Sequence, residues 1–285
     1  MTLDMTRALL IALTTLATAT GCTYTIGHKD VFLVRDANPP LEQLALPTGV
    51  DRAAVRDFDL RVDGRRFLGY RVASKNPARA VVFLTGNGYG ASTALMRVAT
   101  TFHDDRTDLY VISYMQPTED QPRVGQAFAM AGALADFASK TSGISRDKLV
   151  AVGHSLGGWI TLNLAGEDRV GCAVVVGSGT TAPAIARRVI EPRFLATVID
   201  FQSDSDVALL DSEKLARRVR VPTMVVGSES DTMMPPSETQ AIHRSLPDAN
   251  RTELFVATAA THSGFFGDPV VLDAIRSFIR RRCEA

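Results

Sequence analysis

LVAVGHSLGGWITLNLA, at residues 149–165, passes from a continuous apolar run through a glycine-rich turn into a segment with helical spacing. The turn contains the pattern G-x-S-x-G, in which Gly153 and Gly157 flank Ser155. Glycines suit such an elbow because side chains there would collide with the strand and the helix. The pattern predicts that Ser155 stands at the carboxyl end of a strand as a candidate nucleophile. The alternative is a glycine-rich turn whose serine only caps a helix.

Strand and helix patterns alternate over most of the chain. Continuous apolar runs, which are typical of strands buried on both faces, lie at residues 80–84, 109–113, 149–152, 173–176, 221–226 and 252–257. Segments with helical spacing lie at residues 92–102, 125–140, 158–164, 237–246 and 270–281. The short connections between these patterns predict an α/β fold with a mostly parallel central sheet and helices on both faces.

Two further segments extend this prediction. Residues 58–72 alternate apolar and polar side chains around the turn Asp63-Gly64, which predicts two antiparallel strands at the edge of the sheet. Residues 180–220 form a longer connection than a usual crossover, and we expect a small helical insertion that acts as a lid or cap over the carboxyl edge of the sheet. A crossover helix with a long loop is the alternative.

A serine hydroxyl needs a base to remove its proton and a carboxylate to orient that base. Asp231 lies in the loop after the run at 221–226, and His262 lies in the loop after the run at 252–257. Their order along the chain predicts a triad of Ser155, His262 and Asp231. Glu229 is the competing acid. We expect His154 to pack or to line a pocket, because adjacent residues on a tight elbow point apart.

Backbone N–H groups are the expected donors to an oxyanion. Leu156 follows the nucleophile and begins a helix, whose amino terminus favours negative charge. Asn87 lies in the glycine-rich turn after the run at 80–84. The sequence therefore predicts an oxyanion hole built from the N–H groups of Asn87 and Leu156.

Together these motifs resemble the α/β-hydrolase superfamily over nearly all of residues 56–278. The resemblance implies an α/β-hydrolase fold and an acyl-enzyme reaction on a carboxylic ester or thioester, and it is closest to the small-insertion branch of monoglyceride-lipase-like esterases and acyl thioesterases. Thr85 departs from the pattern, since many relatives have His before the oxyanion glycine. Substrate is therefore not carried over from any one relative.

Two other classes of function remain as alternatives. The turn Gly86-Asn87-Gly88-Tyr89-Gly90-Ala91 also reads as G-x-G-x-x-A, the fingerprint of a nucleotide-dependent oxidoreductase. That class leaves Ser155, Asp231 and His262 unexplained. An inactive hydrolase-like binding module is the other alternative, although such a module would be expected to lack a member of the triad.

Composition and charge narrow the partners. The chain has 285 residues with 31 Lys and Arg against 31 Asp and Glu, so no net positive charge favours nucleic acid. No His or Cys residues have the spacing of a metal site, and the chemistry of the triad requires neither metal nor organic cofactor. We expect a small acyl ester or thioester as substrate, no nucleic acid partner and no cofactor. The sequence does not indicate an oligomeric state.

The amino terminus has the composition of a secretory signal. Arg7 precedes an apolar stretch at residues 8–20, and small residues then lead into Cys22. Ala19-Thr20-Gly21-Cys22 resembles a bacterial lipobox, in which the cysteine becomes the lipidated first residue. We expect a signal peptide at 1–21, a tether without periodic structure at 22–55 and a hydrolase domain at 56–285, in a protein exported and lipid-anchored to the cell envelope. An ordinary cleaved signal, giving a periplasmic or secreted protein, and an uncleaved hydrophobic helix are the alternatives.

Two cysteines remain if Cys22 carries a lipid. Cys172 and Cys283 are candidates for a disulfide in an oxidising compartment. A buried thiol and a second thiol in the carboxyl-terminal tail are the alternative. The sequence leaves the choice open.

Overall fold

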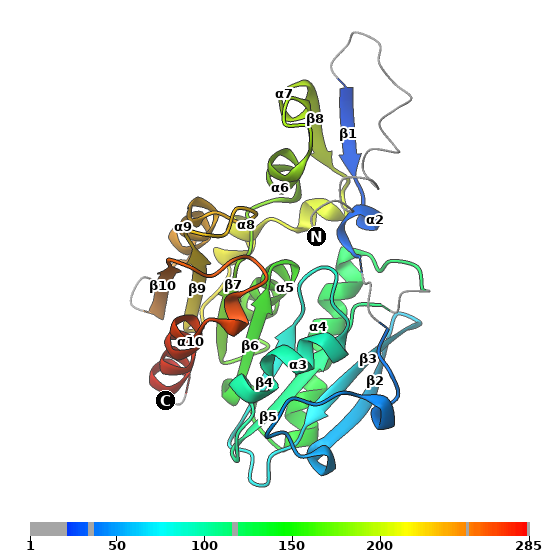
Figure 1. Ribbon diagram of the computed structural model, residues 1–285, viewed down its shortest axis with the longest axis vertical. Helices are drawn as coiled ribbons and strands as arrows, with labels where there is room; N and C mark the ends of the chain where they lie inside the picture. The colour runs from blue at the N-terminus through cyan, green and yellow to red at the C-terminus, as the bar shows by residue number, and fades with distance from the viewer. Residues whose placement is uncertain (1–21, 34–36, 116–118, 249–250, 284–285) are drawn as a thin grey trace.

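The computed structural model describes residues 22–33, 37–115, 119–248 and 251–283, so the expected signal peptide lies outside the described residues. A central eight-stranded sheet with helices on both faces forms the body (Figure 1). Its strands, in chain order, are β2 (Val55–Val62), β3 (Arg65–Val72), β4 (Arg79–Leu84), β5 (Thr107–Ile112), β6 (Leu149–His154), β7 (Cys172–Val176), β9 (Thr223–Ser228) and β10 (Thr252–Ala257). The fold is that of an α/β-hydrolase, as the sequence predicts.

The order of the strands across the sheet is β10-β9-β7-β6-β4-β5-β3-β2. The six strands from β10 to β5 pair in parallel, whereas β3 pairs antiparallel with both β5 and β2. The hairpin predicted around Asp63-Gly64 therefore closes one edge of the sheet. Because the chain runs from β4 first to β5 on one side and then to β6 on the other, the strand order reverses at β4, and the carboxyl end of a strand at such a reversal is where ligands bind in these sheets.

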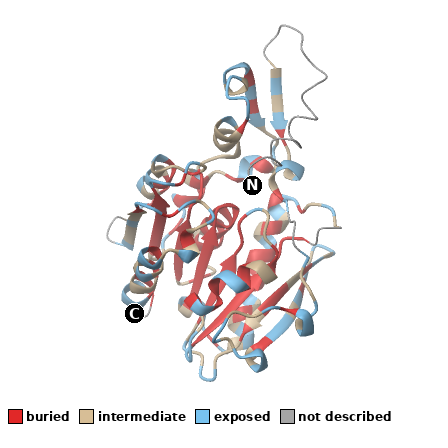
Figure 2. Cartoon of the chain, in the orientation of Figure 1, coloured by how far each residue is buried: buried red, intermediate tan, exposed pale blue. Residues whose placement is uncertain are grey.

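Helices cover both faces because each parallel strand returns through a helical crossover. They are α3 (Ala91–Phe102), α4 (Val124–Ser142), α5 (Leu156–Gly166), α9 (Pro236–Arg244) and α10 (Pro269–Arg282), and short 3-10 turns occur at η3 (Arg146–Lys148) and η6 (Phe265–Gly267). Their bounds agree with the predicted helical segments to within a few residues. Figure 2 shows the central strands buried beneath these helices.

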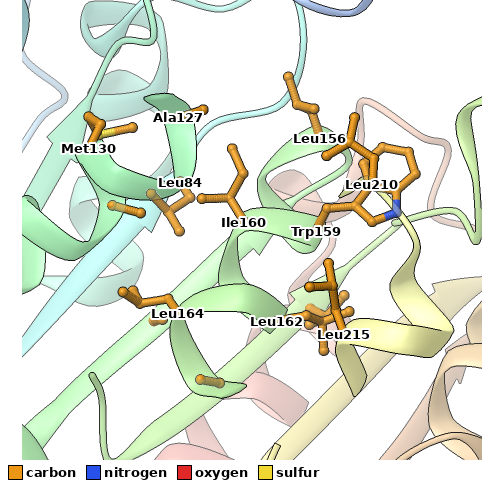
Figure 3. Packing of buried hydrophobic residues seen from close by; sticks show 14 of the residues in the cluster. Leu84, Ala127, Met130, Leu156, Trp159, Ile160, Leu162, Leu164, Leu210 and Leu215 are labelled. Atoms are coloured by element: carbon orange, nitrogen blue, oxygen red, sulfur yellow. The ribbon is translucent and has the colours of Figure 1, made fainter. Parts of the chain in front are cut away.

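The apolar residues form one core on each face of the sheet. Alternate residues of β4 point in opposite directions: Val82 and Leu84 join the core beneath α4 and α5, and Val81 and Phe83 join the core beneath α3 and α10. Figure 3 shows the first core, where side chains of α5 lie among those of neighbouring elements. Burial on both sides explains why the strand sequences read as continuous apolar runs.

The insertion is mainly helical, as predicted, and also contains one strand. It contains helices α6 (Ala182–Val189), α7 (Leu195–Val198) and α8 (Ser212–Ala216) and the 3-10 turn η4 (Val207–Leu209), but also a strand, β8 (Ile199–Ser203). The expectation of a small, mainly helical insertion is confirmed, and β8 is an addition that the sequence does not predict. We refer to residues 180–220 as the cap.

The segment at 22–55 is also more regular than predicted. It contains β1 (Cys22–Ile26), α2 (His28–Val31), η1 (Leu41–Gln43) and η2 (Arg52–Ala54), so the expectation of a tether without periodic structure is wrong. β1 pairs in parallel with β8 of the cap, and the rings of Tyr24 and Phe201 meet edge to face at 6.0 Å. Ile26, Ile199 and Phe201 are buried in this pairing, and Tyr24 is partly buried. The proposed domain boundaries themselves stay a prediction.

Cys172 at the start of β7 and Cys283 at the end of α10 form a disulfide, with 5.6 Å between their Cα atoms. The bond joins the last helix to the middle of the sheet and resolves the choice that the sequence leaves open. Within the described ranges, no helix has the length and apolarity that a bilayer-spanning segment needs.

Candidate active site

The elbow between β6 and α5 holds Ser155 in a strained backbone conformation. Its φ of 52° and ψ of −116° lie outside the regions that L-residues usually adopt. Space is equally restricted on either side, since a Cβ on Gly153 would overlap the carbonyl oxygen of Gly157, and a Cβ on Gly157 would overlap that of Leu84. The glycines of the pattern are therefore needed for close packing. Strain of this kind is common at functional sites.

The structure brings Ser155, His262 and Asp231 together. Ser155 Oγ lies 3.1 Å from His262 Nε2, and His262 Nδ1 lies 2.8 Å from Asp231 Oδ2. Since a carboxylate only accepts, Nδ1 carries the proton, and the lone pair on Nε2 faces the serine hydroxyl. Ser155 and His262 are 107 positions apart in the sequence. They meet because each follows a parallel strand, and both strands end at the same edge of the sheet.

Asp231 is fixed by its own loop. The side chain is 1% exposed, and its Oδ1 accepts the backbone N–H groups of Met233 at 3.0 Å and Met234 at 2.8 Å. The second oxygen, Oδ2, is thereby left for the imidazole. The competing acid, Glu229, is exposed to solvent, and its backbone N–H donates to the carbonyl oxygen of Ala257 in β10 at 2.9 Å.

The two predicted oxyanion donors lie on adjoining elements. Leu156 is the first residue of α5, a position whose N–H has no acceptor within the helix. The turn after β4 approaches the elbow closely, since a Cβ on Gly86 would lie 3.3 Å from the Cβ of Ser155. The side chain of the next residue, Asn87, accepts the N–H of Leu33 at 2.6 Å through Oδ1. That bond restrains the turn through the side chain of Asn87 and does not involve its backbone N–H.

His154 has a second role beside the packing that the sequence predicts. Its ring packs against Tyr89, His262, Phe265 and Phe266, and its Nε2–H donates to the backbone carbonyl of His262 at 2.8 Å. Burial, together with the neighbouring His262, lowers the pKa of His154 to about 3. His154 is therefore neutral near neutral pH and positions the loop that bears His262.

Arg97 supports the same loop from α3. Its Nη1 donates to the carbonyl oxygen of Ser263 at 3.1 Å, and its guanidinium stacks over the ring of Tyr89 at 4.4 Å. Sequence reasoning missed both Arg97 and Tyr89. No local pattern could reveal a contact between residues separated by 166 positions.

Arg188 joins the cap both to α9 and to the loop at residues 229–235, which bears Asp231 and which we call the acid loop. Arg188 of α6 donates to Glu238 Oε1 at 2.6 Å and to the carbonyl oxygen of Met233 at 3.3 Å. The other oxygen of Glu238 accepts the N–H of Thr180 at 2.6 Å. Burial raises the pKa of Glu238, but the hydrogen bonds from Thr180 and Arg188 outweigh it and hold that pKa below its usual value. A charged Glu238 thus links the cap to α9, the helix that directly follows the acid loop.

Among the residues that the structure describes, no three His, Cys, Asp or Glu side chains are grouped so that they would hold a metal ion. The groups available for chemistry at this edge of the sheet are a hydroxyl, an imidazole, a carboxylate and backbone N–H donors. Such a set can perform acyl transfer through a covalent intermediate.

Comparison with solved structures shows the same fold. The chain is similar to an esterase from Pyrococcus furiosus (13% identity, TM-score 0.68, covering 89% of this chain and 100% of that one). It is also similar to Est1E from Butyrivibrio proteoclasticus (15% identity, TM-score 0.62, 79% and 97%) and to 2,6-dihydroxy-pseudo-oxynicotine hydrolase (18% identity, TM-score 0.61, 79% and 67%). No curated protein matches the sequence significantly.

The sequence itself matches a known family. The profile of the prolyl oligopeptidase family aligns with residues 128–274, slightly more than half of the chain, and this range includes Ser155, Asp231 and His262. The finer resemblance to monoglyceride-lipase-like esterases and acyl thioesterases stays a prediction. The chain is a hydrolase of the α/β-hydrolase superfamily and belongs to the prolyl oligopeptidase family.

Proposed function

We propose that the protein is a serine hydrolase that cleaves a carboxylic ester, or a related thioester, through an acyl-enzyme intermediate. The observation that carries the proposal is the continuous line of hydrogen bonds from Ser155 through His262 to Asp231. A hydroxyl paired with an imidazole that a carboxylate orients is the arrangement that activates serine as a nucleophile. The resemblance to small-insertion esterases and thioesterases, noted above, favours acyl esters as the substrate class.

In the first step Ser155 Oγ attacks the acyl carbonyl carbon while His262 Nε2 takes the hydroxyl proton. Asp231 stabilises the resulting imidazolium, and the N–H groups of Asn87 and Leu156 bind the oxyanion. His262 then donates its proton to the leaving oxygen or sulfur, and the tetrahedral intermediate collapses to the acyl-enzyme. Water, deprotonated by His262, releases the acid and restores Ser155.

The nucleotide-dependent oxidoreductase is the weaker alternative. Its glycine fingerprint would have to bind a pyrophosphate at the amino terminus of α3, whereas Gly86 packs against His154 and Ser155. The parallel strands also follow a different order from the 3-2-1-4-5-6 sheet of dinucleotide-binding folds. An inactive binding module is disfavoured because all three triad side chains are present at hydrogen-bonding distance.

A second candidate function is peptide-bond cleavage. The observation that favours it is the match to the prolyl oligopeptidase family across the triad. The same three residues serve both reactions, because His262 can protonate an amine as well as an alkoxide. The leaving group must therefore be identified by experiment.

Turnover of p-nitrophenyl esters of increasing chain length, beside a prolyl p-nitroanilide, distinguishes these functions. We expect ester turnover that falls by about 10³-fold or more in Ser155→Ala. Ser263→Ala is the matched control, since Ser263 is exposed beside His262 and its carbonyl, not its hydroxyl, bonds Arg97. Turnover that survives Ser155→Ala contradicts the assignment of the nucleophile. Rapid anilide cleavage with little ester turnover favours the peptidase.

We also propose that the mature chain begins at an acylated Cys22 and is held at the bacterial cell envelope. Support comes from the apolar stretch at residues 8–20, which ends in small residues directly before the cysteine. Intact-mass analysis of the membrane fraction tests this, and we expect acyl chains on an amino-terminal Cys22. An unmodified soluble mature chain contradicts the proposal.

A further inference from the structure

The cap carries two large apolar side chains that face solvent. Phe194 is 64% exposed and Val198 is 54% exposed, which makes them the most exposed large apolar residues of the cap. Phe194 is the residue before α7 and has helical φ and ψ, so the two side chains lie four positions apart on one face. We call Phe194 and Val198 the cap tip.

The opposite side of α7 is packed. Leu195 and Ala196 are partly buried against the core that includes Ile199 and Phe201 of β8. The hydroxyl of Thr197 donates to the carbonyl oxygen of Phe194 at 2.7 Å, so this polar group beside the cap tip already has an acceptor. One face of α7 is therefore packed against the core, and the opposite face exposes the apolar side chains of Phe194 and Val198 to solvent.

The start of β1 lies at the same end of the cap. β1 and β8 run in parallel, and Cys22 pairs with Ile199, the residue directly after Val198. Parallel strands in this register begin side by side. Figure 1 shows β1, β8 and α7 together at one end of the molecule, projecting from the body that contains the central sheet. The point where the chain reaches Cys22 and the cap tip thus belong to one small surface.

We propose that the cap tip is a membrane-docking surface, which inserts Phe194 and Val198 into the phospholipid bilayer that holds the anchor on Cys22. This inference rests on the anchor proposed above. An anchor alone fixes one point of the protein, whereas two apolar side chains beside it fix an orientation. Because the ordered strand β1 begins at Cys22, little flexible chain separates the anchor from the cap.

The orientation places the cap between the bilayer and the sheet. The same cap contacts the acid loop through Arg188 and Met233. Docking therefore holds the cap and the edge of the sheet that bears Ser155 near the lipid surface. Amphiphilic acyl esters that partition into the bilayer are the substrates that such an arrangement presents to the site.

Quenching by brominated lipids tests the orientation. The variant Phe194→Trp and its control Val270→Trp are prepared as acylated full-length mature chains in vesicles of phosphatidylethanolamine and phosphatidylglycerol, with and without brominated acyl chains. Val270 is 62% exposed, similar to Phe194, but is the second residue of α10 in the body of the molecule. The native Trp159 is 4% exposed and contributes equally to both variants.

We expect brominated lipid to reduce the emission of the indole at position 194 by at least about twofold, because interfacial side chains reach the acyl boundary, and to leave that at position 270 nearly unchanged. Equal quenching at both positions, or none at position 194, overturns the docking surface. A mature chain that lacks acyl mass overturns the anchor and this inference with it. Turnover of a soluble p-nitrophenyl ester in the same samples reports on the hydrolase separately, so its loss beside selective quenching contradicts only the proposed reaction.

Discussion

The ring of His154 and the backbone of His262 are joined by a hydrogen bond of 2.8 Å between Nε2 and the carbonyl oxygen. His154 directly precedes the proposed nucleophile, so the bond runs from the elbow to the loop that bears the proposed base. It acts with the bond from Arg97 to Ser263 at 3.1 Å. Two donors from different elements therefore restrain the main chain on which the imidazole of His262 stands.

Removing the donor at position 154 is expected to slow catalysis without weakening substrate binding. His154→Phe keeps an aromatic ring for packing but loses the bond to the carbonyl of His262, so the imidazole is held less firmly. We expect kcat on a p-nitrophenyl ester to fall by about 10- to 100-fold, the scale of a small misplacement, while KM changes little. Steady-state kinetics measure both constants. His154→Gln, whose amide can donate to the same carbonyl, is the control and should recover most of kcat; equal losses in the two variants would contradict the positioning role.

The buried ring of His154 also predicts how stability depends on pH. The unfolded chain binds a proton at this site below pH 6.5, whereas the folded chain resists protonation until about pH 3. The contribution is therefore complete above pH 6.5 and is lost as the pH falls, with a slope of about 1.4 kcal/mol per pH unit. Urea unfolding at several pH values between 6.5 and 5 measures the slope. His154→Gln should reduce the slope, and the part that remains is expected from His243, whose pKa is also lowered by burial.

Because the elbow is closely packed, we expect that it does not tolerate the single methyl group that an alanine at position 157 would add. A Cβ on Gly157 would overlap the backbone of Leu84 and Thr85, which the central sheet holds in place. Gly157→Ala is expected to abolish soluble expression or to lower the free energy of unfolding by more than about 3 kcal/mol. Gly125→Ala is the matched control, because Gly125 lies in the first turn of α4 with open space around its Cβ position. That substitution should be neutral or stabilising by up to about 1 kcal/mol, and a soluble, stable Gly157→Ala protein would show that the elbow can widen.

Asp108 provides a second stability test, at the amino end of the sheet. The fully buried carboxylate accepts bonds from Arg71 at 2.6 Å, from the N–H of Ser74 at 2.6 Å and from the hydroxyl of Ser142. Burial raises its pKa, but these hydrogen bonds outweigh burial and lower the pKa below its usual value. Asp108→Asn should cost about 3 kcal/mol, because it leaves the guanidinium without its charged partner.

A surface pair serves as its control. Asp59 and Arg66 lie 2.7 Å apart, with side chains 35% and 53% exposed, so Asp59→Asn should change the free energy of unfolding by less than about 1 kcal/mol. Denaturant unfolding of both variants at the same neutral pH gives the comparison. Similar losses in the two variants would contradict the importance of burial at Asp108.

The sheet and the three residues Ser155, Asp231 and His262 could be predicted because the sequence patterns that indicate them are local. Burial on two faces produces continuous apolar runs, and each proposed catalytic side chain follows such a run directly. The chain order along parallel strands then brings the loops to one edge. The positions of Ser155, Asp231 and His262 are therefore implied once the strands are recognised, although their catalytic roles stay a proposal.

What the sequence could not predict depends on partners far along the chain. The alternation of Tyr24 and Ile26 is too short to predict β1 until β8 of the cap is seen beside it. Arg97 gives no sign of its bond to the loop at Ser263, since its neighbours in α3 determine only which face of the helix it occupies. The pairing of Cys172 with Cys283 depends likewise on where α10 packs against β7.

The disulfide between Cys172 and Cys283 would hold together a chain that a protease has cut between these two residues. Residues 191–194 form an exposed connection in the cap, between Cys172 and Cys283. A protease that nicks this connection produces two fragments, one bearing Ser155 and the other bearing Asp231 and His262, and the bridge keeps them covalently attached. On an electrophoresis gel run without reductant the nicked protein should migrate as one species, and it should separate into two bands only after thiol treatment.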